Sequence, residues 1–439
     1  MSTRPLSRLL PLGGELTHAS GADGPAALAG AKAARLASAL AAGLAVLPGW
    51  VIPADEGRPA LAAAIAAVRS GRPASARRAV LGHRLDDVLA GQLHEAVARL
   101  GGRVIVRSSS PLESDPRWSG AFSTVAGVGP GDVVSAVRSC WASAFAVDPL
   151  QRLEACGLPP EALALGVLVQ PEIRLAAGGV ARVNGAGTEV TVEGVRGHPG
   201  ALLAGWADGE SAQVRLPAGP PSRPGEPGTG GGDGLTALLG EQTVTAVARL
   251  AGQVWQELGD DVIEWAAGDG GIWLLQSLRT APAARRPPAP APVPGARPAP
   301  AAVADLLAAR EWMPVLAETV MGRGEHVPGR PAAPGTAAGL LLPCRPHERP
   351  PDGLTDAILL VERPLPALAP LLFGARGVIA RSGAAGSHLA EVARSLGVPM
   401  VTGCRPELVT GAHPAMTGGW LAAIDGCDGD VALLGDWRT

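Results

Sequence analysis

The stretch from 382 to 404, SGAAGSHLAEVARSLGVPMVTGC, contains the histidine with the clearest potential for chemistry. The apolar residues that follow His388 lie at helical spacing: Leu389, Val392, Ala393 and Leu396. Gly397 and Pro399 end this pattern, so we predict a helix with His388 in its first turn. A histidine there can act as a nucleophile, and the free N–H groups of a helix start stabilise a phosphoryl group. The alternative is a histidine that only occupies a capping turn.

Lys32 stands out by composition. The chain has 37 basic residues, and Lys32 is the single lysine among them. An ammonium is a compact point charge that arginine does not imitate, which suits contact with a phosphate. Chance retention of one lysine is the alternative.

A second cationic position follows the apolar run at 103–106. Arg107 is followed by Ser108, Ser109 and Ser110, and then by a polar loop from 111 to 120 that we expect to be flexible. An arginine and hydroxyls delivered into a loop that can close are suited to polyphosphate binding. A polar turn at the end of a strand explains the same residues.

Glu264 and Gln276 lie in two predicted strands, 261–266 and 271–277, that flank the turn Gly-Asp-Gly. If the register of the hairpin allows it, both side chains face the same side. A carboxylate and an amide oxygen are hard ligands of the kind Mg²⁺ takes beside nucleotide phosphates. An ordinary polar cross-strand pair remains the alternative.

The elements that position these residues fall into two groups. We predict a helix at 25–40, a strand at 45–53, a helix at 136–145, a strand at 163–170 and a helical stretch at 235–258 in the first group. The Pro- and Ala-rich segment 281–300 predicts a semi-rigid linker, and 301–328 a connector with a helical stretch at 302–321. From 329 to 439, short strands alternate with helices, which predicts a small α/β domain.

Composition excludes several classes of protein. The net charge of −3 over 439 residues lacks the basic signature of nucleic-acid binding. No long apolar run or signal-peptide pattern is present, so we expect a cytoplasmic protein without membrane contact. The five cysteines are scattered, which favours free thiols over a structural zinc site.

Four motifs, in this order, resemble the phosphoenolpyruvate synthase and pyruvate phosphate dikinase family, which includes rifampicin phosphotransferases and phenylphosphate synthase. They are GAKAARLASALAAGLAVLPGWVIP, IVRSSSPLESDPRWSGAFSTVAGV, DVIEWAAGDGGIWLLQS and SGAAGSHLAEVARSLGVPMVTG. The last is similar to the family motif around its phosphorylated, swivelling histidine. The four motifs lie within the regions 1–280 and 329–439.

The resemblance implies an ATP-grasp nucleotide-binding domain at 1–280, tethered to a swivelling phosphohistidine domain at 329–439, in a multidomain α/β and α+β protein. It implies that ATP and Mg²⁺ phosphorylate His388, with release of AMP and phosphate, and that Ser387 orients His388. It further implies Glu264 and Gln276 as metal ligands. The implied nucleotide-binding residues are Lys32, Arg107, Ser108, Ser109, Gly120, Glu193 and Arg279.

The sequence departs from the family pattern near the metal ligands. Val262 stands where the family has aspartate, and Leu278 where it has arginine. Either the site is weakened, or Asp261 and Arg279 substitute by a shift of one residue. The family's acceptor-binding domain is also missing from the pattern. We therefore expect an unknown small-molecule acceptor, held by this chain or by a separate substrate-binding protein. A nucleotide-binding subunit without catalysis is the alternative.

Overall fold

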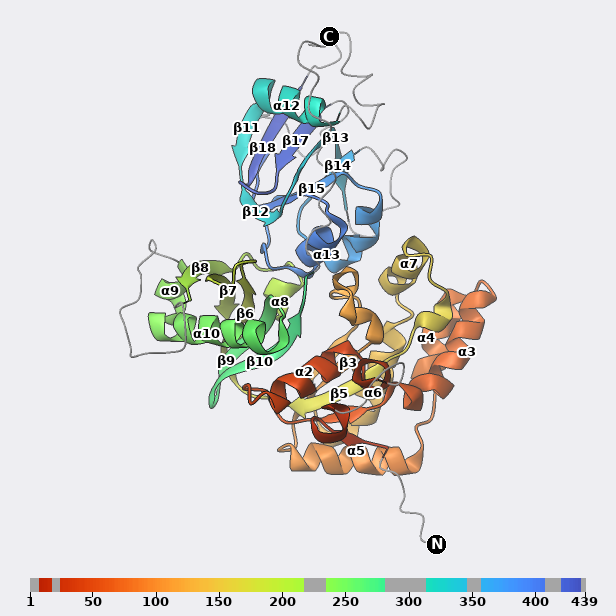
Figure 1. The fold of residues 1–439 in the computed structure, drawn as a ribbon. Helices are drawn as coiled ribbons and strands as arrows, with labels where there is room; N and C mark the ends of the chain where they lie inside the picture. Colours follow the sequence, from red (N-terminus) through yellow and green to blue (C-terminus); the bar gives the residue numbers. More distant parts are fainter. Residues whose placement is uncertain are drawn as a thin grey trace. The chain divides into compact units, whose positions relative to one another are not determined.

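The computed structural model describes residues 8–17, 24–216, 234–280, 313–345, 357–406 and 420–435. The chain separates into two compact units, one comprising Met1–Pro199 and Glu210–Arg279, the other Gly200–Gly209 and Thr280–Thr439. Each unit combines β-sheet with helices, so the expected multidomain α/β architecture is confirmed (Figure 1). The predicted linker at 281–300 lies outside the described residues. Among the helices that are described, none is long and apolar enough to cross a membrane.

The first sheet of the N-terminal unit contains the strand that carries Arg107. Its strands are antiparallel neighbours in the order β1-β2-β5-β3-β4, with bounds Leu10–Pro11, Trp50–Ile52, Gly166–Pro171, Val104–Ser109 and Thr124–Val128. Helices α3, α4, α5 and α6 share its apolar core, with bounds Arg58–Arg69, Pro73–Leu81, Asp87–Arg99 and Val133–Ser143. The core places β3 and β5 at the centre of this half of the unit.

The second sheet of the unit contains the predicted hairpin. Its antiparallel strands follow the order β10-β9-β6-β7-β8, with bounds Gly271–Leu278, Val262–Gly268, Leu175–Val183, Glu189–Arg196 and Glu210–Arg215. The helix α10, Glu241–Leu258, lies along this sheet (Figure 1), preceded by α9, Gly234–Leu239. Trp265 and Leu274 pack in the same core as α10. Successive side chains of a strand point to opposite faces of the sheet, so the residues of β9 on either side of Trp265 face away from α10.

The helix predicted at 25–40 is two helices. The helix α1 spans Pro25–Ala29 and α2 spans Ala31–Ala41, and Gly30 separates them with a φ of +79°. A Cβ at Gly30 would lie 2.0 Å from the carbonyl oxygen of Ser109, so only glycine allows this approach. The N–H of Ala31 donates to Ser110 O at 3.0 Å. The start of α2 is thereby docked on the end of β3.

The loop at 111–120, which we expected to be flexible, is organised by two short turns. They span Pro111–Ser114 and Pro116–Trp118. Trp118 is buried and stacks on Phe122 with ring centroids 5.9 Å apart. The fully buried Arg152, on α7 (Val147–Ala155), donates to Arg117 O at 2.7 Å and to Ser119 O at 3.0 Å. The expectation missed these contacts because Arg152 is distant in the sequence.

The second unit is built on one mixed sheet. Its order is β11-β18-β17-β13-β14-β15-β16-β12. The strands β13 to β16 run parallel, with bounds Thr336–Cys344, Ala357–Val361, Gly377–Ala380 and Met400–Thr402. The antiparallel strands are β11, β12, β17 and β18, with bounds Glu325–Pro328, Arg330–Ala333, Leu421–Asp425 and Asp430–Leu434.

Part of the predicted connector belongs to this unit. The helix α12, Met313–Arg323, buries Leu316 and Val320 against β13, β17 and β18, and β11 pairs with β18. The boundary we placed at 329 is therefore too late for the packed structure. The reason is that α12 packs on β17 and β18, about a hundred residues further along the chain, as well as on β13.

Replacing Gly30 by alanine should disrupt the docking of α2 on β3. The new Cβ meets Ser109 O at 2.0 Å, and we expect the free energy of unfolding to fall by more than about 3 kcal/mol in urea denaturation. Gly43→Ala is the matched control, because Gly43 has a φ of +75° but no atom within 4 Å of an added Cβ. That variant should lose only about 1–2 kcal/mol. Equal losses would contradict the importance of the contact.

Candidate functional site

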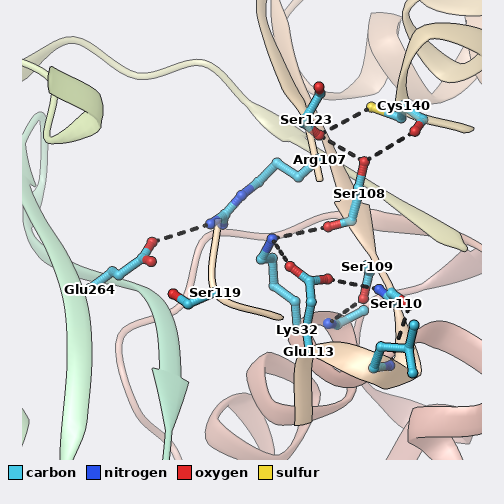
Figure 2. A network of polar contacts seen from close by, with 12 residues as sticks. Lys32, Arg107, Ser108, Ser109, Ser110, Glu113, Ser119, Ser123, Cys140 and Glu264 are labelled. Carbon is cyan, nitrogen blue, oxygen red and sulfur yellow. Dashed lines mark hydrogen bonds and ion pairs between the residues drawn. The ribbon is translucent and has the colours of Figure 1, made fainter. Parts of the chain in front are cut away.

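Lys32 is buried near the start of α2 and is held by two oxygen atoms. Its Nζ donates to Ser108 O at 3.0 Å and to Glu113 Oε1 at 3.1 Å (Figure 2). An ammonium has three donors, and the described residues supply partners for two of them. The remaining donor suits an anionic ligand.

The hydroxyls of Ser108 and Ser109 are fully buried and bonded within the protein. Ser108 Oγ donates to Ser123 O at 2.7 Å, and Ser109 Oγ accepts from the N–H of Ala33 at 3.0 Å. We expected these hydroxyls to contact phosphate. In the structure they fix β3 and the start of α2 around Lys32, and their contact with phosphate stays a prediction.

Arg107 projects from β3 and contacts the second sheet of the same unit. Its Nη1 donates to Leu275 O at 2.7 Å and to Gln170 Oε1 at 3.2 Å, and its Nη2 lies 3.9 Å from Glu264 Oε2 (Figure 2). Burial lowers the pKa of the guanidinium, while Glu264 and Glu113 act in the opposite direction. The pKa of an arginine is high enough that the group stays charged. Arg107 is thus a fixed cation beside Lys32.

Three predicted polar residues lie in one cross-strand row of the second sheet. Gln276 pairs with Glu264, Glu264 with Val180, and Val180 with Glu193. Directly paired residues point to the same face of a sheet, so the predicted same-side arrangement of Glu264 and Gln276 is confirmed. Trp265 and Leu274 form the neighbouring cross-strand pair, and their side chains face α10. Glu264, Gln276 and Glu193 therefore share the opposite face.

The donor set of this row fits a magnesium ion accompanying a nucleotide. Glu264 offers a carboxylate and Gln276 an amide oxygen, and both side chains are buried but not fully enclosed. Mg²⁺ commonly takes one or two protein oxygens and completes its shell with phosphates and water. Glu264 and Gln276 are the residues that would hold it, and their position near Arg107 is consistent with phosphates at the same place.

His388 is the first residue of α13, His388–Leu396, in the second unit. Ser387 is the N-cap, and its Oγ accepts from the N–H of Ala390 at 3.4 Å. The face predicted for this helix is confirmed, because Leu389, Val392 and Ala393 are fully buried. His388 itself is partly exposed. A ring that is accessible at a capped helix start is suited to carrying a phosphoryl group.

Gly383 shapes the turn before this helix. It has a φ of +103°, and its carbonyl oxygen accepts from Arg330 Nη2 at 3.1 Å. Arg394, in the last turn of α13, donates to Ala385 O at 2.8 Å and to Glu391 Oε1 at 2.6 Å. These contacts fix the loop between β15 and α13, and with it the start of the helix that presents His388.

Comparison with known proteins places Lys32, Arg107 and His388 in matched regions, whereas Glu264 and Gln276 lie outside them. Residues 26–218 match the model described as "Pyruvate phosphate dikinase, AMP/ATP-binding domain", and residues 354–429 match "PEP-utilising enzyme, mobile domain". The chain belongs to the phosphoenolpyruvate synthase and pyruvate phosphate dikinase family. Lys32 and Arg107 lie in the first match and His388 in the second.

A family member illustrates the extent of the match. A probable phosphoenolpyruvate synthase of Methanothermobacter thermautotrophicus is 26% identical over 333 residues, which cover 68% of this chain and 43% of that protein. The chain therefore spans less than half of the length of this relative.

Similarity to solved structures is low. A biotin carboxylase complex from Campylobacter jejuni aligns with 56% of this chain and 40% of its own, at 13% identity and a TM-score of 0.28. Aconitase X of Thermococcus kodakaraensis aligns with 25% of this chain and 99% of its own, at 16% identity and a TM-score of 0.20. At these scores neither likeness bears on fold or function.

Arg279 lies away from the row that contains Glu264 and Gln276. It is exposed, and its Nε donates to Gly259 O at 2.7 Å, beyond the end of α10. Asp261 forms an ion pair with Arg182, with Oδ2 and Nη1 3.7 Å apart. Val262 and Leu278 are paired and occupy the site-facing side of β9 and β10. Alternation along the strand turns Arg279 away from Gln276, so the structure does not place Arg279 where a shift of one residue would require it.

Two residues that contact the predicted cations were not predicted. Glu113 binds Lys32, and Gln170 binds Arg107 and donates to Leu47 O at 2.9 Å. Glu113 has a sequence signal, because Ser110-Pro111-Leu112-Glu113 fits the S-x-x-E capping box, which the structure contains. Gln170 has none, since its contacts join segments distant in the chain. Gly120, which was predicted, has a φ of +66° directly after the second turn of the loop.

Arg107→Lys should weaken ATP binding by about tenfold or more, because lysine does not replace a planar group that holds Leu275 O and Gln170 while facing a phosphate. Binding is measured by titration calorimetry. Arg103→Lys is the control, since Arg103 lies just before the same strand in an exposed pair with Glu172. Unchanged binding in Arg107→Lys would show that Arg107 does not contact the nucleotide.

Cys140 should resist alkylation in the folded protein. Burial raises the pKa of its thiol to about 11, so only about one thiol in a thousand is ionised at pH 8. Exposed Cys427 should react with iodoacetamide under the same conditions, and Cys140 only above pH 10 or after denaturation. Peptide mass spectrometry reads out both sites. Equal rates at pH 8 would contradict the burial of Cys140.

Proposed function

We propose that this chain is an ATP-dependent phosphotransferase of the dikinase type, which passes the β-phosphate of ATP through His388 to a small-molecule acceptor. The observation that carries the proposal is the pairing, in one chain, of a cationic site in the AMP/ATP-binding match with a partly exposed helix-start histidine in the mobile-domain match. Either feature by itself is compatible with several roles. Together they supply a donor site and a carrier.

The proposed first step is attack by a neutral imidazole nitrogen of His388 on the β-phosphorus of ATP. The bond from that phosphorus to the bridging oxygen of the α-phosphate breaks, and AMP leaves with the electron pair. The γ-phosphate is then released to water as inorganic phosphate, which leaves one phosphoryl group on the ring. Imidazole is a suitable carrier because it is a nucleophile near neutral pH.

The residues of the nucleotide site act by position and charge. Lys32 and Arg107 offset the negative charge of the phosphates, and such stabilisation is the main source of catalysis in phosphoryl transfer. Glu264 and Gln276 would hold Mg²⁺, which supplies further charge neutralisation at the phosphates. Glu193 lies on the same face of the sheet and is proposed as a nucleotide contact. Ser387 caps α13 and so fixes the backbone next to the reacting ring.

The acceptor is proposed as a small molecule bound by this chain or by a separate substrate-binding protein. The described residues offer no assignment of its chemistry. We further propose that the second unit moves to bring His388 to its two partners, in keeping with the description of its family match as a mobile domain.

One observation favours a second candidate function, a nucleotide-binding subunit without phosphotransfer. Val262 and Leu278 replace charged residues of the family pattern with apolar ones, and Arg279 lies elsewhere. A site that lacks a carboxylate and an arginine retains fewer groups for stabilising the transition state. Under this hypothesis ATP binds, but no AMP forms with any acceptor.

Phosphorylation of His388 is directly testable. The chain incubated with ATP that carries radioactive phosphorus at the β position should acquire an acid-labile label and release AMP in equal amount. His388→Ala should lose the label, since no other ring occupies the helix start. ATP binding by His388→Ala should be unchanged.

His326→Ala is the matched control. His326 lies in the same unit, but its ring contacts Asp430 and the carbonyl of Met321. It should retain the label. Equal labelling of the wild type and His388→Ala would overturn the proposal, whereas ATP binding without any label in the wild type would favour the non-catalytic candidate.

A further inference from the structure

Glu113 occupies a place that its capping role alone does not explain. Its Oε2 accepts from the N–H of Ser110 at 2.8 Å, which completes the capping box of the turn Pro111–Ser114. Its Oε1 is 3.1 Å from Lys32 Nζ. A cap on a surface turn normally leaves its second oxygen in water, yet this side chain is only 7% exposed. Both oxygens of Glu113 thus have fixed partners (Figure 2).

The geometry restricts the ammonium of Lys32 to one location. Glu113 and Ser108 O hold two of its donors, and Ser108 belongs to the strand that also carries Arg107. A lysine side chain has a flexible stem of four carbons linked by rotatable bonds, so without such contacts its ammonium samples many positions. The backbone N–H of Ser110 fixes the carboxylate of Glu113, and this carboxylate in turn fixes the ammonium of Lys32.

We propose that Glu113 is a positioning residue for phosphate binding, which holds the ammonium of Lys32 with one donor directed to the nucleotide. This inference rests on the proposed function in that it assigns Lys32 to the phosphates, and it adds a residue that acts through Lys32 without touching the ligand. The carboxylate also compensates the charge of the buried amine. An unpaired charge at this depth is strongly unfavourable.

The single lysine of the chain makes the environment of Lys32 measurable by itself. In the untagged 439-residue chain, an amine-reactive ester can acylate only Lys32 and the terminal amine. Wild-type Lys32 should react slowly, because it is buried and held by Ser108 O and Glu113 Oε1. Glu113→Ala should react about fivefold faster or more, since the amine then loses its ion pair and is less enclosed. Peptide mass spectrometry, with the terminal amine as internal reference, gives the rate.

Asp115→Ala is the matched control for the loop. Asp115 caps the neighbouring turn, where its carboxylate accepts from the N–H of Arg117 and pairs with that side chain. Removing it loosens the same loop without touching Lys32, so the acylation rate of Lys32 should stay at the wild-type value. If Glu113→Ala fails to fold, Glu113→Gln takes its place, because the amide preserves the cap acceptor but removes the charge.

A double-mutant cycle on ATP affinity tests whether Glu113 acts through Lys32. Glu113→Ala should weaken ATP binding about tenfold in the wild-type background and have almost no effect in Lys32→Ala. A loss of the same size in both backgrounds, or an acylation rate equal to the wild type, would overturn the inference. Neither measurement involves His388. Failure of His388 to be labelled would therefore reject the proposed function and leave this assignment standing.

Discussion

The candidate nucleotide site depends on one close approach, the contact between Gly30 and the carbonyl oxygen of Ser109. No side chain fits between the two backbones, and the left-handed φ of Gly30 lets α2 begin where α1 has ended. The N–H groups of Ala31 and Ala33 then bond to the end of β3. Lys32 lies between these two residues, so the backbone itself sets where its side chain starts. The position of the cation follows from helix docking rather than from the side chain's own preferences.

The two sheets of the first unit are joined by polar contacts as well as by packing. Arg107 reaches from β3 to β10, and Arg35, on α2, forms an ion pair with Asp260, which accepts from Ser277 Oγ at 2.7 Å. Asp260 is almost fully buried, and charges at such depth require partners. These contacts tie the helix that carries Lys32 to the strand that carries Gln276. The groups proposed to bind phosphate and metal therefore belong to one connected network.

Local patterns in the sequence predicted the parts of the site whose geometry is local. The helix after His388 and the β9–β10 hairpin follow from the period of apolar residues and from a Gly-Asp-Gly turn, and the structure contains both. The contacts of Ser108 and Ser109 inside the protein were not predicted, because they are set by tertiary packing, with Ser109 and Ala33 separated by 76 positions. The loop at 111–120 is ordered by Arg152, and α12 is positioned by strands near the end of the chain. Both are long-range contacts, which local sequence patterns do not reveal.

The β-bulge at Leu275 has a consequence for how the site tolerates sequence change. Leu275 is the extra residue between the pairs made by Leu274 and Gln276, and its carbonyl oxygen accepts from Arg107. Every residue type has this backbone carbonyl, so the hydrogen bond from Arg107 does not depend on which side chain is present at 275. The hydrogen bond from Arg107 depends instead on the number of residues in β10, which sets the position of this carbonyl. Over evolutionary time this position is therefore open to substitution but closed to deletion, because losing one residue would also turn Gln276 to the other face of the sheet.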